Sequence, residues 1–91
     1  MESDKINITE PVAEQIKAFD PSDRNLIAGV LALLKDADWR ETHKVNFGLI
    51  DGKQTWAIAE ARVTIAFVEE SDGTFTVHFV NMRSRFRPSW L

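Results

Sequence analysis

The sequence predicts an α+β fold in which a helical hairpin packs on one face of a twisted, mainly antiparallel sheet. Its 91 residues suffice for a single domain with one core, and 44% of them are hydrophobic. Apolar residues recur with helical spacing in the first third of the chain and alternate with polar residues in the second half. Because helices and strands are segregated in this way, we expect the order β-α-α-β-β-β, with room for one further strand.

The first elements are expected to be a short strand and two helices. Residues 5–9 alternate apolar and polar side chains and predict the strand. Pro11 stops strand pairing and suits the first turn of a helix. Residues 20–23 (Asp-Pro-Ser-Asp) combine a capping acid with a proline at the first helical position, so they predict the start of a second helix. The hairpin is expected to cover about residues 11–36.

A meander of antiparallel strands is expected over about residues 44–82. Apolar residues alternate in four runs, which are Val45/Phe47/Leu49, Trp56/Ile58, Val63/Ile65/Phe67 and Phe75/Val77/Phe79. Residues 51–52 (Asp-Gly) and 71–73 (Ser-Asp-Gly) supply turns, whereas residues 59–61 (Ala-Glu-Ala) contain neither Gly nor Pro. Each strand is expected to bury one set of side chains and to expose the other. The polar residues 40–44 are expected to form a loop.

The charge distribution places any cationic site near the C-terminus. Fourteen acidic against eleven basic residues give a net charge of −3, which argues against general nucleic-acid binding. Residues 1–41 hold nine acids and five bases, whereas residues 83–91 hold three arginines and no acid. The segment 83–91 is therefore expected to be a basic tail.

The composition also excludes several kinds of chemistry. Without cysteine the chain has no disulfide, thiol nucleophile or Cys-based zinc site, and two histidines exclude a three-histidine metal site. The four glycines are scattered, so no phosphate-binding loop is predicted. We expect no metal and no cofactor. The chain has no apolar run of membrane-spanning length and no signal peptide, so we expect a cytoplasmic protein that does not bind membranes.

Two segments resemble the RelE/ParE superfamily, the small toxins of bacterial toxin–antitoxin pairs. Residues 56–67 (Trp-Ala-Ile-Ala-Glu-Ala-Arg-Val-Thr-Ile-Ala-Phe) are similar to a strand pair of the family in which an arginine, here Arg62, opens the second strand after a short turn. Residues 77–83 (Val-His-Phe-Val-Asn-Met-Arg) are similar to its last strand, which runs into basic residues. The resemblance spans most of the chain and implies a RelE-like domain over residues 1–91, with a cognate antitoxin as partner.

The resemblance also implies an activity and a site. Ribosome-dependent members cleave mRNA in the ribosomal A site without a metal, which would make the ribosome and mRNA partners of this chain. Matched residue by residue, the site falls on Arg62 and on Arg83 or Arg85, with Lys53 as the strand lysine. The chain departs from the pattern in residues 57–60, where the family often has a basic residue, and in having no tyrosine.

The residue types themselves suit metal-free cleavage of RNA. Such cleavage needs a general base, a general acid and stabilisation of charge on the phosphate, and the arginine fork suits the last task. Alternation predicts that Arg62 and His78 both lie on the helix-free face of the sheet. Together with Arg83, which the resemblance implies, these residues are expected to be catalytic. As simpler alternatives, His78 is a structural residue, and Arg62 pairs with Glu60 or Glu69 across the sheet.

The basic tail, residues 83–91, allows three interpretations. Arg85 and Arg87 flank Phe86, which offers phosphate contacts and a ring for base stacking, so with Lys53 these are the expected RNA-binding residues. Alternatively, the apolar residues of the tail pack back on the core. In the third interpretation the tail is a docking surface for a protein, because Arg and Trp are enriched at binding hot spots.

Two classes of function follow. The first is a toxin that acts as a ribosome-dependent mRNA endonuclease and inhibits translation. The second is a non-enzymatic binding module on the same fold, which includes a gyrase-type inhibitor or a catalytically degenerate homologue. The acidic net charge and the missing tyrosine favour the second class.

Overall fold

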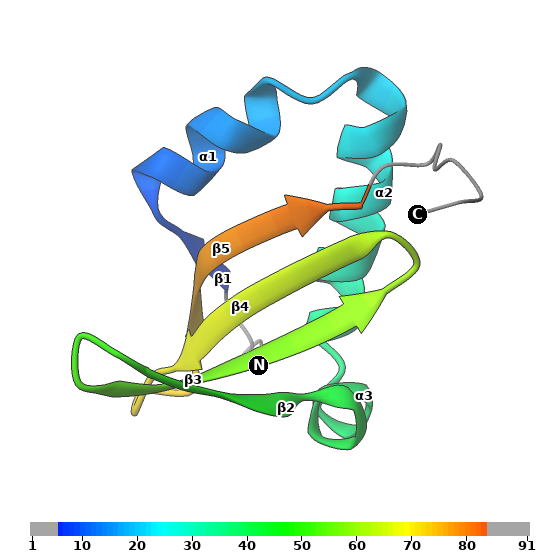
Figure 1. Cartoon of the computed structure of the whole chain (residues 1–91). Coiled ribbons are helices and arrows are strands. Elements are labelled where there is room, and N and C mark those ends of the chain that lie inside the picture. The colour runs from blue at the N-terminus through cyan, green and yellow to red at the C-terminus, as the bar shows by residue number, and fades with distance from the viewer. Residues whose placement is uncertain (1–5, 84–91) are drawn as a thin grey trace, which may run out of the picture.

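The computed structural model describes residues 6–83, which form three helices and one five-stranded sheet (Figure 1). In chain order the elements are β1 (Ile6–Ile8), α1 (Glu10–Lys17), α2 (Pro21–Leu34), α3 (Ala37–His43), β2 (Val45–Ile50), β3 (Lys53–Glu60), β4 (Val63–Glu69) and β5 (Phe75–Met82). The predicted α+β class is confirmed. Within the part of the chain described, no helix is long and apolar enough to cross a membrane.

The strands lie in the order β1-β5-β4-β3-β2. β2 to β5 form an antiparallel meander, whereas β1 joins β5 in parallel, with Ile6 opposite Phe75. A parallel neighbour needs a long connection, which the helices and the other strands supply. β5 is therefore an interior strand over Phe75–Val77, whereas among the described strands its second half pairs with β4 alone.

Asp residues begin the second and third helices. The Asp20 carboxylate accepts the backbone N–H of Asp23 at 3.0 Å, and Pro21 follows at the first position, as the sequence predicts. Asp36 caps α3 in the same way, accepting the N–H groups of Asp38 and Trp39 at 3.0 and 3.2 Å. The prediction of a loop at residues 40–44 is therefore wrong, because a seven-residue helix that packs only one large apolar side chain has no visible periodicity.

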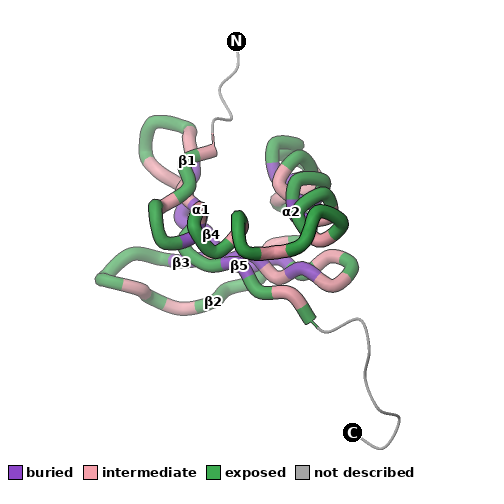
Figure 2. Tube along the Cα trace, turned by 90° about the horizontal axis from the view of Figure 1, so that it is seen from above, coloured by how far each residue is buried: buried purple, intermediate pink, exposed green. Residues whose placement is uncertain are grey.

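The core lies between the helices and one face of the sheet (Figure 2). The buried apolar side chains are Val12 from α1, Ile27, Val30 and Leu34 from α2, and Ile58, Val63, Ile65, Phe67, Phe75, Val77 and Val80 from β3 to β5. Burying side chains of this size contributes about 1.5–3 kcal/mol each, before the cost of conformational entropy. α1 contacts β5, α2 contacts β4 and α3 contacts β3, so all three helices share this face.

β5 contains a bulge that changes the face of its second half. The register leaves His78 unpaired between Val77 and Phe79. One extra residue reverses the alternation, so Val77 faces the helices before the bulge and Val80 faces them after it. The prediction that Phe79 shares the face of Phe75 and Val77 is therefore wrong, and Phe79 is 42% exposed on the opposite face.

β2 is an edge strand whose large apolar side chains are not buried. Val45, Phe47 and Leu49 are between 50% and 71% exposed, contrary to the prediction that one side of this strand enters the core. The strand pairs only with β3, and a second bulge between Asn46 and Gly48 leaves Phe47 outside the register. The apolar alternation in this segment therefore marks an exposed strand.

The turn between β3 and β4 forces Ala61 into the left-handed region, at φ 56°. An L-residue with a Cβ is less stable there than glycine by about 1–2 kcal/mol. We expect Ala61→Gly to raise the free energy of unfolding by up to about 1 kcal/mol, because glycine also loses more entropy on folding. Urea denaturation measures the change.

Ala59→Gly, two residues earlier in β3, is the matched control and should lower the free energy of unfolding by about 0.5–1 kcal/mol. A destabilising Ala61→Gly would contradict the described turn.

Candidate functional site

Arg62 and Arg83 meet at the end of the sheet where β4 begins and β5 stops. Arg83 donates its backbone N–H to the Arg62 carbonyl at 2.8 Å, and Arg62 Nη1 donates to the Arg83 carbonyl at 2.9 Å. Both backbone polar groups of Arg83 are thus bound by Arg62. The structure brings together two of the three residues expected to be catalytic.

The Arg62 guanidinium also reaches the helix layer. Its Nη2 lies 3.0 Å from Asp23 Oδ1 in the first turn of α2, and the two side chains are 25% and 19% exposed. The expectation that Arg62 lies on the helix-free face is therefore wrong for its charged end, because the turn at Ala61 interrupts the strand alternation. Its partner is neither Glu60 nor Glu69, the two cross-sheet partners considered above. The ion pair joins α2 to the sheet.

Arg83 is the accessible cation of this pair of arginines. Its side chain is exposed, and its Nη2 lies 3.4 Å from the Ala61 carbonyl. Within residues 6–83 no carboxylate forms an ion pair with it. An exposed guanidinium with a fixed backbone and no counter-charge among the described residues is suited to bind an anion such as a phosphate.

The other predicted site residues are not gathered here. His78 precedes Arg83 by five residues, which is about 16 Å along a strand. Lys53 opens β3 at the opposite end from Arg62, and its Nζ lies 3.8 Å from Glu70. The remaining three, Arg85, Phe86 and Arg87, lie outside the described residues.

A second polar cluster joins α3 to β4, and the sequence analysis missed it. Glu69 accepts from Arg40 Nε at 3.3 Å and from Lys44 Nζ at 3.0 Å, and Lys44 also binds Glu41 at 2.8 Å. Each cation covers an aromatic ring, since Arg40 lies over Phe75 and Lys44 lies over Trp56, at 4.9 and 4.2 Å.

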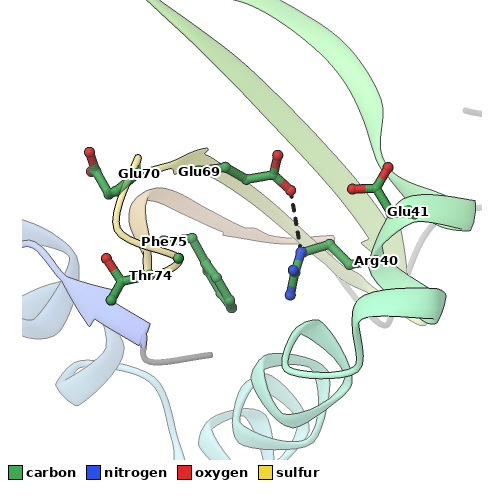
Figure 3. A pocket seen from close by; sticks show the side chains of 7 residues that line it. Arg40, Glu41, Glu69, Glu70, Thr74 and Phe75 are labelled. Carbon is green, nitrogen blue, oxygen red and sulfur yellow. Dashed lines mark hydrogen bonds and ion pairs between the residues drawn. The ribbon is translucent and has the colours of Figure 1, made fainter. Parts of the chain in front are cut away.

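Four residues of this cluster and its rings, Arg40, Glu41, Glu69 and Phe75, border a cavity of about 220 Å³ (Figure 3). Its lining consists of Arg40, Glu41, Glu69, Glu70, Gly73, Thr74 and Phe75. The carboxylates are bound within the protein, because Glu69 and Glu41 have the partners named above and Glu70 accepts the Thr76 hydroxyl at 2.7 Å. Across the described part of the chain, no group of three or more potential metal ligands lies together. The cluster therefore acts as a structural connection between α3 and the sheet.

The cluster shifts the pKa values of the mostly buried Lys44 side chain and of the exposed Glu41 side chain in opposite directions. Burial alone would lower the pKa of Lys44, but the hydrogen bonds to Glu41 and Glu69 outweigh it and the pKa is raised. The hydrogen bond from Lys44 lowers the pKa of Glu41. Both charged forms are stabilised by folding.

Comparison with known proteins shows the fold. No protein-family model matches the chain, and no curated protein is similar to it in sequence. The fold is similar to that of a chain in the crystal structure of an archaeal RelE–RelB complex from Pyrococcus horikoshii OT3. The TM-score is 0.68 at 9% sequence identity, over 92% of this chain and 99% of that chain. The RelE-like fold implied by the sequence resemblance is thus confirmed.

Glu69→Gln should destabilise the protein by about 2–3 kcal/mol, because it leaves two cations without their shared carboxylate. The side chains of Arg40 and Lys44 are each only 11% exposed, so solvent compensates little. Glu14→Gln, which removes an exposed ion pair to Lys17, is the control and should cost at most about 0.5 kcal/mol. Equal effects of the two variants on thermal unfolding would contradict the role of Glu69.

Lys44 should make stability depend on alkaline pH. A raised pKa contributes stability that is complete below the ordinary lysine value of 10.5 and is lost as pH rises through the folded value. The difference in unfolding free energy between wild type and Lys44→Met should therefore shrink above pH 10.5. Denaturation series from pH 8 to about 11.5 measure it, and parallel curves for the two proteins would refute it.

Proposed function

We propose that this protein is the toxin of a toxin–antitoxin pair and inhibits translation by cleaving mRNA on the ribosome. The observation that carries the proposal is the position of Arg62 and Arg83 at one end of a RelE-like sheet, where the sequence resemblance puts the family's arginines. The similar fold was determined in a RelE–RelB complex, which supports an antitoxin as the partner here.

Arg83 takes the role of phosphate ligand in this proposal. Its exposed guanidinium stabilises the charge that develops on the phosphorane without a metal, while Arg62 holds its backbone in place. His78 supplies acid–base chemistry to an RNA strand that extends from Arg83 along β5. Lys53, Arg85, Phe86 and Arg87 provide further contacts to phosphate or base.

The exposed edge strand β2 supports a protein partner. Residues 45–50 (Val-Asn-Phe-Gly-Leu-Ile) contain no charge, and the outer backbone edge of the strand is not paired within the sheet. Uncharged edge strands with exposed apolar side chains favour strand addition by another chain. An antitoxin segment that pairs with β2 would cover Val45, Phe47 and Leu49.

A non-enzymatic module, such as a gyrase-type inhibitor, is the second candidate. The internal ion pair of Arg62 with Asp23 favours this candidate, because the Asp23 carboxylate neutralises a guanidinium that a nuclease would need to bind phosphate. The separation of His78 from both arginines points the same way.

Induced expression in a bacterial host, with protein synthesis and mRNA cleavage followed together, tests the proposal. Wild type should arrest synthesis and produce cuts in ribosome-bound mRNA. Arg83→Ala should lower the cleavage rate by about 10²–10³, the usual cost of losing one group that stabilises transition-state charge. Lys35→Ala, which removes an exposed lysine of equal charge from the end of α2, is the control and should arrest growth like wild type.

The alternatives give different results. Arrest without mRNA cleavage would contradict the nuclease and direct attention to supercoiling assays with gyrase. Normal growth at confirmed levels of folded protein would contradict both toxin activities.

A further inference from the structure

The bulge at His78 brings three different side chains into line on the open face of the sheet, which is the face opposite the helices. Alternation after the bulge places Phe79, Asn81 and Arg83 on this face. Successive members are two residues apart, which is about 6.7 Å along the strand. All three are exposed, so they form a continuous strip that ends at the accessible arginine.

The surface beside this strip is made of small side chains. Phe79 lies opposite Ala66, which in turn lies opposite Ala57, and Asn81 lies opposite Thr64. The two alanines are buried at 0% and 6% exposure, so they form a floor beside the ring. Phe79 is therefore a large aromatic side chain without a large neighbour across the strands, and the core does not use it.

The charges around the strip favour an anionic ligand. The open-face positions that neighbour it on β3 and β4, which are Ala57, Ala59, Thr64 and Ala66, carry no carboxylate. Glu70, near the other end of the sheet, is bound by Lys53 and Thr76. Asp23, near the arginine end, is bound by Arg62.

Strand addition does not explain the strip. β1 pairs with the outer edge of β5 only over Phe75–Val77, and beyond the bulge the Gln15 amide of α1 donates to the Val80 carbonyl on that edge, so α1 occupies part of the edge that a partner strand would need. Affinity on the sheet face itself comes from side chains. A ring, an amide and a guanidinium match the base, the polar edges and the phosphate of a nucleotide.

We propose that Phe79, Asn81 and Arg83 form a binding strip for single-stranded RNA. A base stacks on the Phe79 ring, the Asn81 amide bonds a base edge or a ribose hydroxyl, and the Arg83 guanidinium binds a phosphate. This inference rests on the proposed function and adds the path that the RNA takes, along β5 and across the open face. The proposal assigns a function to Phe79, which is not part of the core and does not contact the two arginines in any described interaction.

Fluorescence anisotropy with a labelled, single-stranded oligouridylate tests the strip with purified full-length protein. Phe79→Leu keeps an apolar side chain but removes the stacking ring, and should weaken binding about tenfold. Phe79→Trp should bind like wild type. Leu33→Ala, which shortens an exposed apolar side chain on α2, is the control and should leave the affinity unchanged.

The salt dependence of RNA binding distinguishes the contribution of the Phe79 ring from that of the Arg83 charge. Arg83→Gln should reduce the slope of log K against log salt by about 0.7, because one phosphate contact is lost. Phe79→Leu should weaken binding at every salt concentration with an unchanged slope. Because Phe79 lies outside the core, its variants should keep the urea midpoint of wild type, which confirms that they are folded.

Equal affinity of wild type and Phe79→Leu for the RNA would overturn the strip, as would no binding by wild type at about 1 mM protein. So would a Phe79→Leu variant that loses affinity for a protein partner but not for RNA. Translation arrest, measured in parallel, keeps the two proposals apart. Arrest by wild type combined with unchanged RNA binding by Phe79→Leu refutes the strip alone, whereas absence of arrest refutes the toxin.

Discussion

One extra residue in the last strand, His78, determines which side chains enter the core and which reach the open face of the sheet. Before it Val77 faces the helices, and after it Val80 does. Gln15 of α1 donates to the Val80 carbonyl at 2.8 Å, so the helix layer is bonded to the backbone just beyond the bulge. Exposing the Phe79 ring costs less free energy than this register gains by burying Val77 and Val80. The exposed ring becomes part of a surface that ends in Arg83.

Arg62 holds the same end of the sheet in place. Its guanidinium bonds the first turn of α2 through Asp23 and the end of β5 through the Arg83 carbonyl. A single side chain thus connects the helix layer, the turn at Ala61 and the last strand. The two arginines therefore have different roles. Arg62 is bound within the protein by Asp23, whereas the side chain of Arg83 is exposed to solvent.

The sequence is sufficient for the fold class and for the start of α2 at Asp20, because periodicity and local capping chemistry indicate them. The grouping of Arg62 with Arg83 follows from the family resemblance and not from periodicity. The sequence is insufficient for α3, whose cap at Asp36 starts a helix with one large apolar contact. Period-two alternation also fails at a bulge, so it predicts the wrong face for Phe79. The Arg40–Glu69–Lys44 cluster joins residues far apart in the chain, so no local sequence pattern predicts it.

In the proposed complex, RNA lies on the open face of the sheet and reaches Arg83 along β5. The most direct measurement is a two-dimensional ¹H–¹⁵N NMR titration of the labelled protein with single-stranded RNA. The backbone signals of residues 78–83 and of the facing positions 64–66 are expected to shift together and to saturate, while those of β2 and α3 do not move. Shifts confined to β2, or to the cavity beside Arg40, would contradict it.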